Sequence, residues 1–150
     1  MIDRPQGGAI GRINFSRVVL GGILAGILIN ISEYLRYDVV LRGEFEEGLR
    51  ALGRGLPKGA AVTTVWTLWG FALGIAAVWL YAAIRPRYGP GASTAVRAGL
   101  AVWFFTSLLA IIAMRAMGLF SISPVALVWT LVECVAATLA GAWLYRESEP

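Results

Sequence analysis

Few side chains in the apolar part of this sequence could do chemistry, and Glu133 is the foremost of them. It stands in the middle of LVWTLVECVAATLAGAWLY, an apolar run over residues 127–145. Glu33, Cys134 and the tyrosines are the other groups with chemistry to offer. Cys134 must point about 100° away from Glu133 around a helix, and a thiol in apolar surroundings is usually inert. We therefore assign no catalytic residue.

The sequence contains no histidine. Histidine is the commonest protein ligand of zinc, copper and haem, and it is the usual acid or base at neutral pH. We therefore expect no metal site and no cofactor, and we disfavour metal catalysis and triad-type hydrolysis.

The composition indicates a membrane protein. Hydrophobic residues make up 58% of the 150 residues and charged residues 15%, whereas soluble domains have roughly 25% charged residues. Four apolar runs are each long enough to cross a hydrocarbon core of about 30 Å. The sequence predicts an all-α fold: a single transmembrane four-helix bundle over residues 1–150 that contacts the lipid bilayer.

The four predicted membrane helices cover residues 18–37, 60–84, 95–117 and 124–145. The first resembles a signal peptide, but no small-x-small cleavage site follows it, so we interpret it as an uncleaved helix. Residues 38–58 form a connector in which Phe45, Leu49 and Leu52 share one helical face, which predicts a short interfacial helix. The stretch RPRYGPGAS contains two prolines and two glycines, which predicts a tight break between the second and third helices.

Arginines flank the apolar runs. The net charge of +4 and the pI near 9.7 therefore indicate topology and lipid headgroups rather than nucleic acid. Arg85 and Arg87 are candidate headgroup contacts, and their compact segment favours an orientation with both termini inside. A homo-oligomer or a membrane partner protein is compatible with this pattern.

The second and fourth helices share a sequence echo. VWTL occurs at residues 65–68 and 128–131, and WLY at 79–81 and 143–145. Duplication of a two-helix unit would produce this likeness, and a common aromatic belt would also produce much of it. In a duplication, Gly70 would correspond to Glu133.

Small and polar residues recur on one face of three predicted helices. Lipid is as apolar as leucine, so membrane helices associate through close packing of small residues and through hydrogen bonds. The glycines expected to pack helices are Gly22, Gly26, Gly70, Gly74 and Gly141. The polar residues expected to meet inside the bundle are Asn30, Glu33, Thr63, Thr67 and Glu133. We call this second set the polar cluster.

The depths of these residues support such a cluster. Glu133 should lie about 14 Å, and Asn30 about 10 Å, from the same membrane side. We expect them to meet, with Arg36 or Arg115 approaching Glu33 from the rim.

The charge state of Glu133 follows from its depth. An ionised carboxylate there costs several kcal/mol unless it is paired, and no Lys or Arg lies in the middle of any run. We therefore expect a neutral acid that is hydrogen-bonded to Asn30 or to a threonine. Such a group suits proton or small-solute handling, and it equally suits interhelical bonding in a structural or accessory subunit. Both hypotheses stay open, and a small enzyme acting on a lipophilic substrate is the third.

Three segments, GGILAGILINISE, RPRYGPG and VWTLVE…LAGAWLY, together resemble a group of small bacterial four-helix integral membrane proteins. The likeness spans nearly the whole chain. It implies a four-helix membrane fold in a bacterial inner membrane, and it implies no activity because the group has none assigned.

Overall fold

The protein is described by a computed structural model that covers residues 12–57, 59–118 and 123–147. Every regular element in these ranges is helical. In chain order they are α1 (Phe15–Tyr34), the π-helical segment η1 (Leu35–Val40), α2 (Arg42–Ala51), α3 (Ala60–Tyr88), α4 (Ala92–Trp103), the π-helical segment η2 (Phe104–Leu108), α5 (Leu109–Ala116) and α6 (Pro124–Leu144).

Four continuous stretches of helix are long and apolar enough to cross a membrane. They are Phe15–Val40, Ala60–Tyr88, Ala92–Ala116 and Pro124–Leu144. The predicted fold class, an all-helical membrane bundle with four spans, is confirmed. Two spans include π-helical segments that the sequence pattern did not predict, and the first span consequently extends to Val40.

The break between the second and third spans is shorter than expected. Helix α3 continues through Pro86 to Tyr88, and only Gly89 to Gly91 form the turn. Pro86 lies in the last turn of the helix and supplies no N–H to the preceding turn, and the helix ends two residues later. Gly89 and Gly91 have φ angles of +83° and +119°, which glycine adopts without the steric penalty of a side chain.

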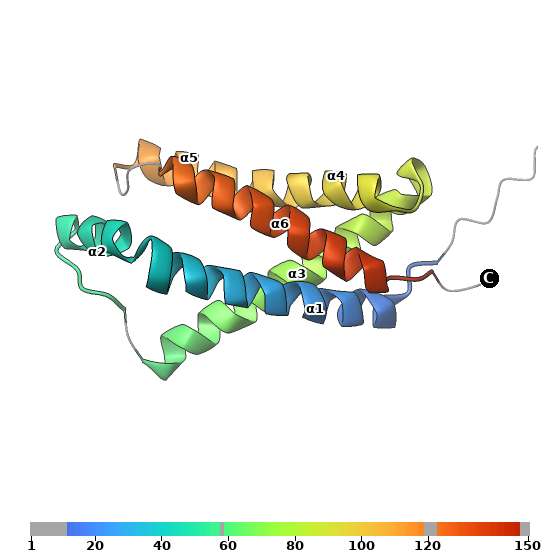
Figure 1. Ribbon diagram of the computed structural model, residues 1–150, viewed down its shortest axis with the longest axis horizontal. Coiled ribbons are helices and arrows are strands. Elements are labelled where there is room, and N and C mark those ends of the chain that lie inside the picture. The colour runs from blue at the N-terminus through green and yellow to red at the C-terminus, as the bar shows by residue number, and fades with distance from the viewer. Residues whose placement is uncertain (1–11, 58, 119–122, 148–150) are drawn as a thin grey trace, which may run out of the picture.

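Packing is uneven across the membrane. Figure 1 shows α3 crossing the other spans obliquely, so that its N-terminal part lies apart from α6. The buried residues of α3 begin at Gly70, and α2 and α5 contain none. The tightly packed half therefore contains the starts of α1 and α4 and the ends of α3 and α6. The loosely packed half lies on the opposite membrane side, with α2 and α5.

Helix α1 is the centre of the bundle, since it packs chiefly against α3 and α6, while α4 packs mainly against α6. Glycines permit the close approaches. A Cβ atom added at Gly74 would lie 2.5 Å from the Gly22 carbonyl oxygen and 2.8 Å from the Gly26 Cα atom. A Cβ atom at Gly141 would lie 2.7 Å from the carbonyl oxygen of Gly21. The fifth expected packing glycine, Gly70, lies against the Asn30 side chain.

Two tyrosines join the first helix pair, α1 and α3, to the second pair, the span α4–α5 and α6, at the tightly packed end. The hydroxyl of Tyr145, after α6, accepts a hydrogen bond from the backbone N–H of Asn14, which caps α1 (3.3 Å). The hydroxyl of Tyr81, in α3, accepts one from the backbone N–H of Gly91, which caps α4 (3.3 Å). The two rings meet edge to face, with centroids 5.9 Å apart. Each pair thus uses its second helix to hold the start of the other pair's first helix.

The connector contains the short helix α2 at the predicted place. Phe45, on its apolar face, packs against Tyr37 of η1 with ring centroids 4.9 Å apart. Helix α2 is therefore joined to the end of the first span.

Candidate functional site

A partly buried ion pair, Arg36 with Glu33, lies in the polar region of the bundle. The Arg36 guanidinium donates to both carboxylate oxygens of Glu33, with Nη2 at 2.5 Å from Oε1 and 2.6 Å from Oε2. Arg36 as a whole is only 9% exposed, and its guanidinium lies 4.1 Å from the centre of the Tyr37 ring. Of the two candidates for approaching Glu33, Arg36 does so, whereas Arg115 lies exposed on α5.

The π-helical segment η1 contains this arginine. Its backbone bond from the Leu41 N–H to the Arg36 carbonyl spans five residues (2.8 Å), which is the mark of a π turn. Such turns occur frequently at functional sites. Here the π-helical segment begins two residues after Glu33, within the same span.

Glu133 lies deep between α6 and α1. It is 8% exposed, and it lies beside Ser32 and Glu33, within electrostatic range of Arg36. Its Oε2 atom has no hydrogen-bond partner among the described residues. Since Arg36 is already bound by Glu33 through two oxygens, the carboxyl of Glu133 is incompletely satisfied.

Asn30 does not join Glu133. Its amide nitrogen donates to the Gly26 carbonyl (2.8 Å) and, across the helix contact, to the Thr67 carbonyl (3.3 Å). Successive residues are about 100° apart around a helix, so Asn30 and Ser32 lie on nearly opposite faces of α1. Asn30 therefore faces α3, while Ser32 and Glu133 meet on the α6 side.

The two threonines of the polar cluster have different places. Thr67 contributes its backbone carbonyl to Asn30 and is half-buried. Thr63 is exposed, and its hydroxyl donates to the Gly59 carbonyl of its own first turn (3.5 Å). The structure thus brings Glu33 and Glu133 together, sets Asn30 and Thr67 on the neighbouring interface, and leaves Thr63 at the surface.

Two residues that the sequence analysis did not single out complete the α1–α6 contact. The Trp129 indole N–H donates to the Ser32 hydroxyl at 2.9 Å. Trp129 precedes Glu133 by one helical turn and Ser32 adjoins Glu33. Their proximity in sequence to the two intramembrane acids is the pattern from which Ser32 and Trp129 could have been predicted as site residues.

Arg85 and Arg87 lie at the tightly packed end. Arg85 pairs with Glu147 (3.0 Å), and its side chain is 19% exposed. Its guanidinium also lies 5.7 Å from the centre of the Tyr145 ring. Arg87 is exposed and is the better placed of the two to reach a headgroup.

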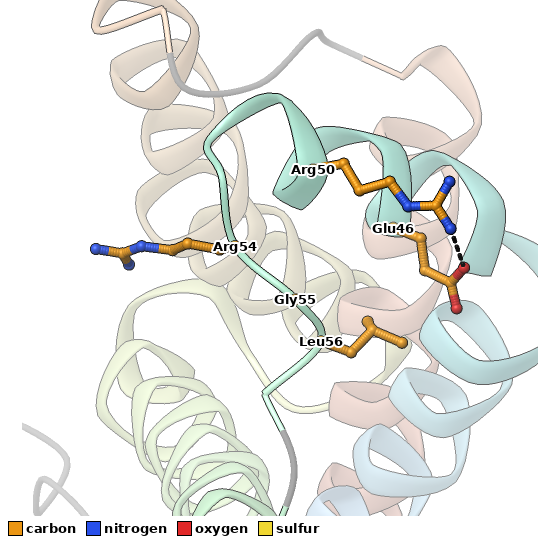
Figure 2. A pocket seen from close by; sticks show the side chains of 5 residues that line it. All are labelled: Glu46, Arg50, Arg54, Gly55 and Leu56. Atoms are coloured by element: carbon orange, nitrogen blue, oxygen red, sulfur yellow. Dashed lines mark ion pairs between the residues drawn. The ribbon is translucent and has the colours of Figure 1, made fainter.

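A hollow lies outside the spans, where α2 meets the following loop. Its volume is about 430 Å³, and it is lined by Glu46, Arg50, Arg54, Gly55 and Leu56. Figure 2 shows Arg50 directed at Glu46, to which it is paired at 3.9 Å, while Arg54 points away. An exposed ion pair of this kind contributes little energy, so this hollow provides no built site.

Cys134 is buried beside Glu133 and packs with Ala77 and Val102, and its carbonyl accepts a hydrogen bond from the Thr138 hydroxyl (2.6 Å). Among the described residues, no group of three His, Cys, Asp or Glu side chains could hold a metal ion. Tyr81 and Tyr145 lie at the tightly packed end of the bundle, away from Glu33 and Glu133, whereas Tyr37 lies beside Arg36.

No protein-family model, curated protein or solved structure matches this chain.

Proposed function

We propose that this integral membrane protein handles protons or a small solute through the carboxyl of Glu133. The observation that carries the proposal is that two neighbouring acids differ in their bonding partners. Glu33 has a bidentate cation, whereas Glu133 is buried and has one oxygen without a hydrogen-bond partner in the described residues.

The chemistry follows from the count of charges. Two carboxylates with one guanidinium leave one excess negative charge, which is costly in a low-dielectric interior. A proton on Glu133 removes that charge, and so would a bound cation. Because either a proton or a cation can compensate this charge, Glu133 is suited to exchange one for the other.

Replacement of Glu133 by Gln tests the proposal. The amide keeps the shape of the side chain and cannot release a proton, so pH-dependent flux should fall to background. The measurement is proteoliposome flux at two pH values for the wild type and Glu133→Gln. Glu47→Gln, which changes an exposed acid on α2, is the matched control and should leave the flux unchanged. Equal flux in the wild type and Glu133→Gln would contradict proton handling.

A structural or accessory subunit is the second candidate function. The observation that favours it is the pair of interhelical hydrogen bonds formed by Asn30 and Trp129. Both bonds join neighbouring spans and need no ligand. In this case Glu133→Gln would leave every transport assay unchanged and would alter only the stability of the bundle. A small enzyme acting on a lipophilic substrate is the third, and the burial of Cys134 speaks against a thiol nucleophile.

We also propose a bacterial inner-membrane location with both termini inside, and membership of the small four-helix group that the sequence resembles. The support for the orientation is the pair of arginines close to the turn at Gly89–Gly91, where positive charge acts most strongly on topology.

A further inference from the structure

A groove of about 750 Å³ runs along the contact between α1 and α6. Its volume lies in the range of pockets that hold small organic ligands. The lining that matters here consists of Leu28 and Ser32 of α1 and Val128, Trp129, Val132 and Glu133 of α6.

The groove opens sideways, towards the lipid. Val128 and Val132 are each 61% exposed and belong to a membrane span, so acyl chains surround them. Its lining is predominantly apolar, and Ser32, Trp129 and Glu133 supply the polar groups. A molecule in this groove would therefore contact hydrocarbon on most sides and the Glu133 carboxyl on the remaining side.

The charges select the kind of molecule. The cation nearest to Glu133, Arg36, is engaged by Glu33, so an ionised Glu133 still needs a counter-ion. A small metal ion would require several oxygen ligands, and valines and alanines make up much of the groove. An organic cation with an apolar body meets both conditions, and the Trp129 ring can add a cation–π contact.

We propose that this groove binds a lipophilic organic cation, taken laterally from the bilayer, with the Glu133 carboxylate as its counter-ion. The inference rests on the proposed function, since the same carboxyl would hold a proton when the groove is empty.

The proton and the cation should compete. The other titratable or charged groups near Glu133 are Glu33 and Arg36 of the first span, Tyr37 of η1 and Cys134 of α6. Glu33 and Arg36 neutralise each other, and tyrosine and cysteine are ordinarily uncharged at neutral pH. Cation binding should therefore weaken as the pH falls and Glu133 becomes protonated.

The test uses radiolabelled tetraphenylphosphonium with the full-length protein in lipid nanodiscs. Glu133→Gln should weaken binding by at least about tenfold because the buried counter-ion is lost, while Glu47→Gln should not change it. The neutral analogue triphenylphosphine oxide should bind all three proteins alike. Equal phosphonium binding by the wild type and Glu133→Gln would overturn the inference.

A second variant tests the groove with Glu133 intact. Ala136 lines the groove and is exposed, so Ala136→Trp should fill it and reduce phosphonium binding about tenfold. Ala76→Trp, on an exposed position of α3, is the matched control and should bind normally. If Glu133→Gln fails to fold, Ala136→Trp and the pH dependence of the wild type decide the matter.

The remaining outcomes separate the two proposals. Glu133-dependent flux without phosphonium binding would overturn the inference and leave the proposed function standing. Phosphonium binding that depends on Glu133 and Ala136, without any Glu133-dependent proton flux, would support the groove and remove proton handling. If Ala136→Trp turned a dimer into a monomer without changing phosphonium binding, the groove would be an interface between copies, and the inference would be overturned.

Discussion

At the scale of single residues, the intramembrane acids divide into one that is satisfied and one that is not. Arg36 and Glu33 form a short bidentate pair in which the arginine is almost fully buried. Such a pair costs desolvation to form, but removal of one partner leaves an uncompensated charge. Arg36 is therefore more important for stability than an ordinary interfacial arginine.

Arg36→Met should lower the free energy of unfolding by about 3 kcal/mol, because Glu33 is left unpaired beside Glu133. Equilibrium unfolding in mixed micelles measures the loss. Arg42→Met is the control, since its exposed pair with Glu46 should contribute less than about 1 kcal/mol. Adding Glu33→Gln to Arg36→Met should recover part of the loss. Similar losses for Arg36→Met and Arg42→Met would contradict the assigned role of the buried pair.

At the scale of elements, the contact between α1 and α3 depends on backbone proximity. Gly74 fits between Gly22 and Gly26 of the neighbouring helix with no room for a side chain. This contact also sets the position of Asn30, which reaches the Thr67 carbonyl only when the two helices are this close.

Gly74→Leu should destabilise the bundle by at least about 2 kcal/mol, because overpacking forces the helices apart. Ala76→Leu lies two residues later on an exposed position of α3 and should be nearly neutral. Unfolding in mixed micelles compares the two variants. A loss of stability in both variants alike would show that leucine is poorly tolerated anywhere in α3, and would remove the argument from close packing.

At the scale of the whole molecule, the two helix pairs hold each other in the same way. The hydroxyls of Tyr81 and Tyr145 each accept a hydrogen bond from the N-cap residue of the other pair. These tyrosines end the two WLY segments of the sequence echo. Duplication of a two-helix unit, with parallel halves related by an axis along the membrane normal, would account for these reciprocal bonds. Gly70 and Glu133 would then be equivalent positions, of which only one holds an acid.

If Tyr81 and Tyr145 have equivalent roles, removing either hydroxyl should lower the free energy of unfolding by the same amount. Tyr81→Phe and Tyr145→Phe should each lower the free energy of unfolding by about 0.6 kcal/mol, the average for an interhelical hydrogen bond in a membrane. Tyr34→Phe, at a side chain that is 62% exposed, should cost nothing measurable. Unequal losses for the two buried tyrosines in unfolding experiments would count against equivalent halves.

The orientation of the molecule can be tested with single cysteines. Cys134 is buried and should react slowly, so Arg54→Cys and Arg87→Cys supply the reactive thiols. With both termini inside, an impermeant maleimide should label Arg54→Cys in spheroplasts, and label Arg87→Cys only after the membrane is opened. The reverse pattern would show that the termini lie outside.

The sequence predicted the four spans and placed the two acids near one membrane side. It did not predict how each helix is rotated about its own axis. Depth follows from residue count, so Glu33 and Glu133 could be placed near one membrane side. Rotation depends on which neighbour packs against which face. Asn30 was expected to meet Glu133, yet it faces α3. The glycines of α1 allow α3 to approach this face of α1 closely.

Ser32, Trp129 and the π turn at Arg36 show the same limit. Tryptophan is common near membrane interfaces and serine is common where membrane helices pack, so their types alone do not identify a hydrogen bond between two spans. A π turn leaves no mark in hydrophobic periodicity over six residues, and the bidentate contact of Arg36 with Glu33 could be expected only as an approach from the rim.

The uneven packing described above gives the molecule a gradient of stiffness from one membrane face to the other. Close glycine contacts and the paired tyrosines fix one end, whereas α2, α5 and the first turns of α3 bury no residues. Segments with few buried contacts open at low free energy. Glu133 lies at the boundary, since the buried residues of α6 begin at Thr130. If Glu133 exchanges its occupant as proposed, the accompanying motion should therefore occur in the loosely packed half and appear at a single face of the membrane.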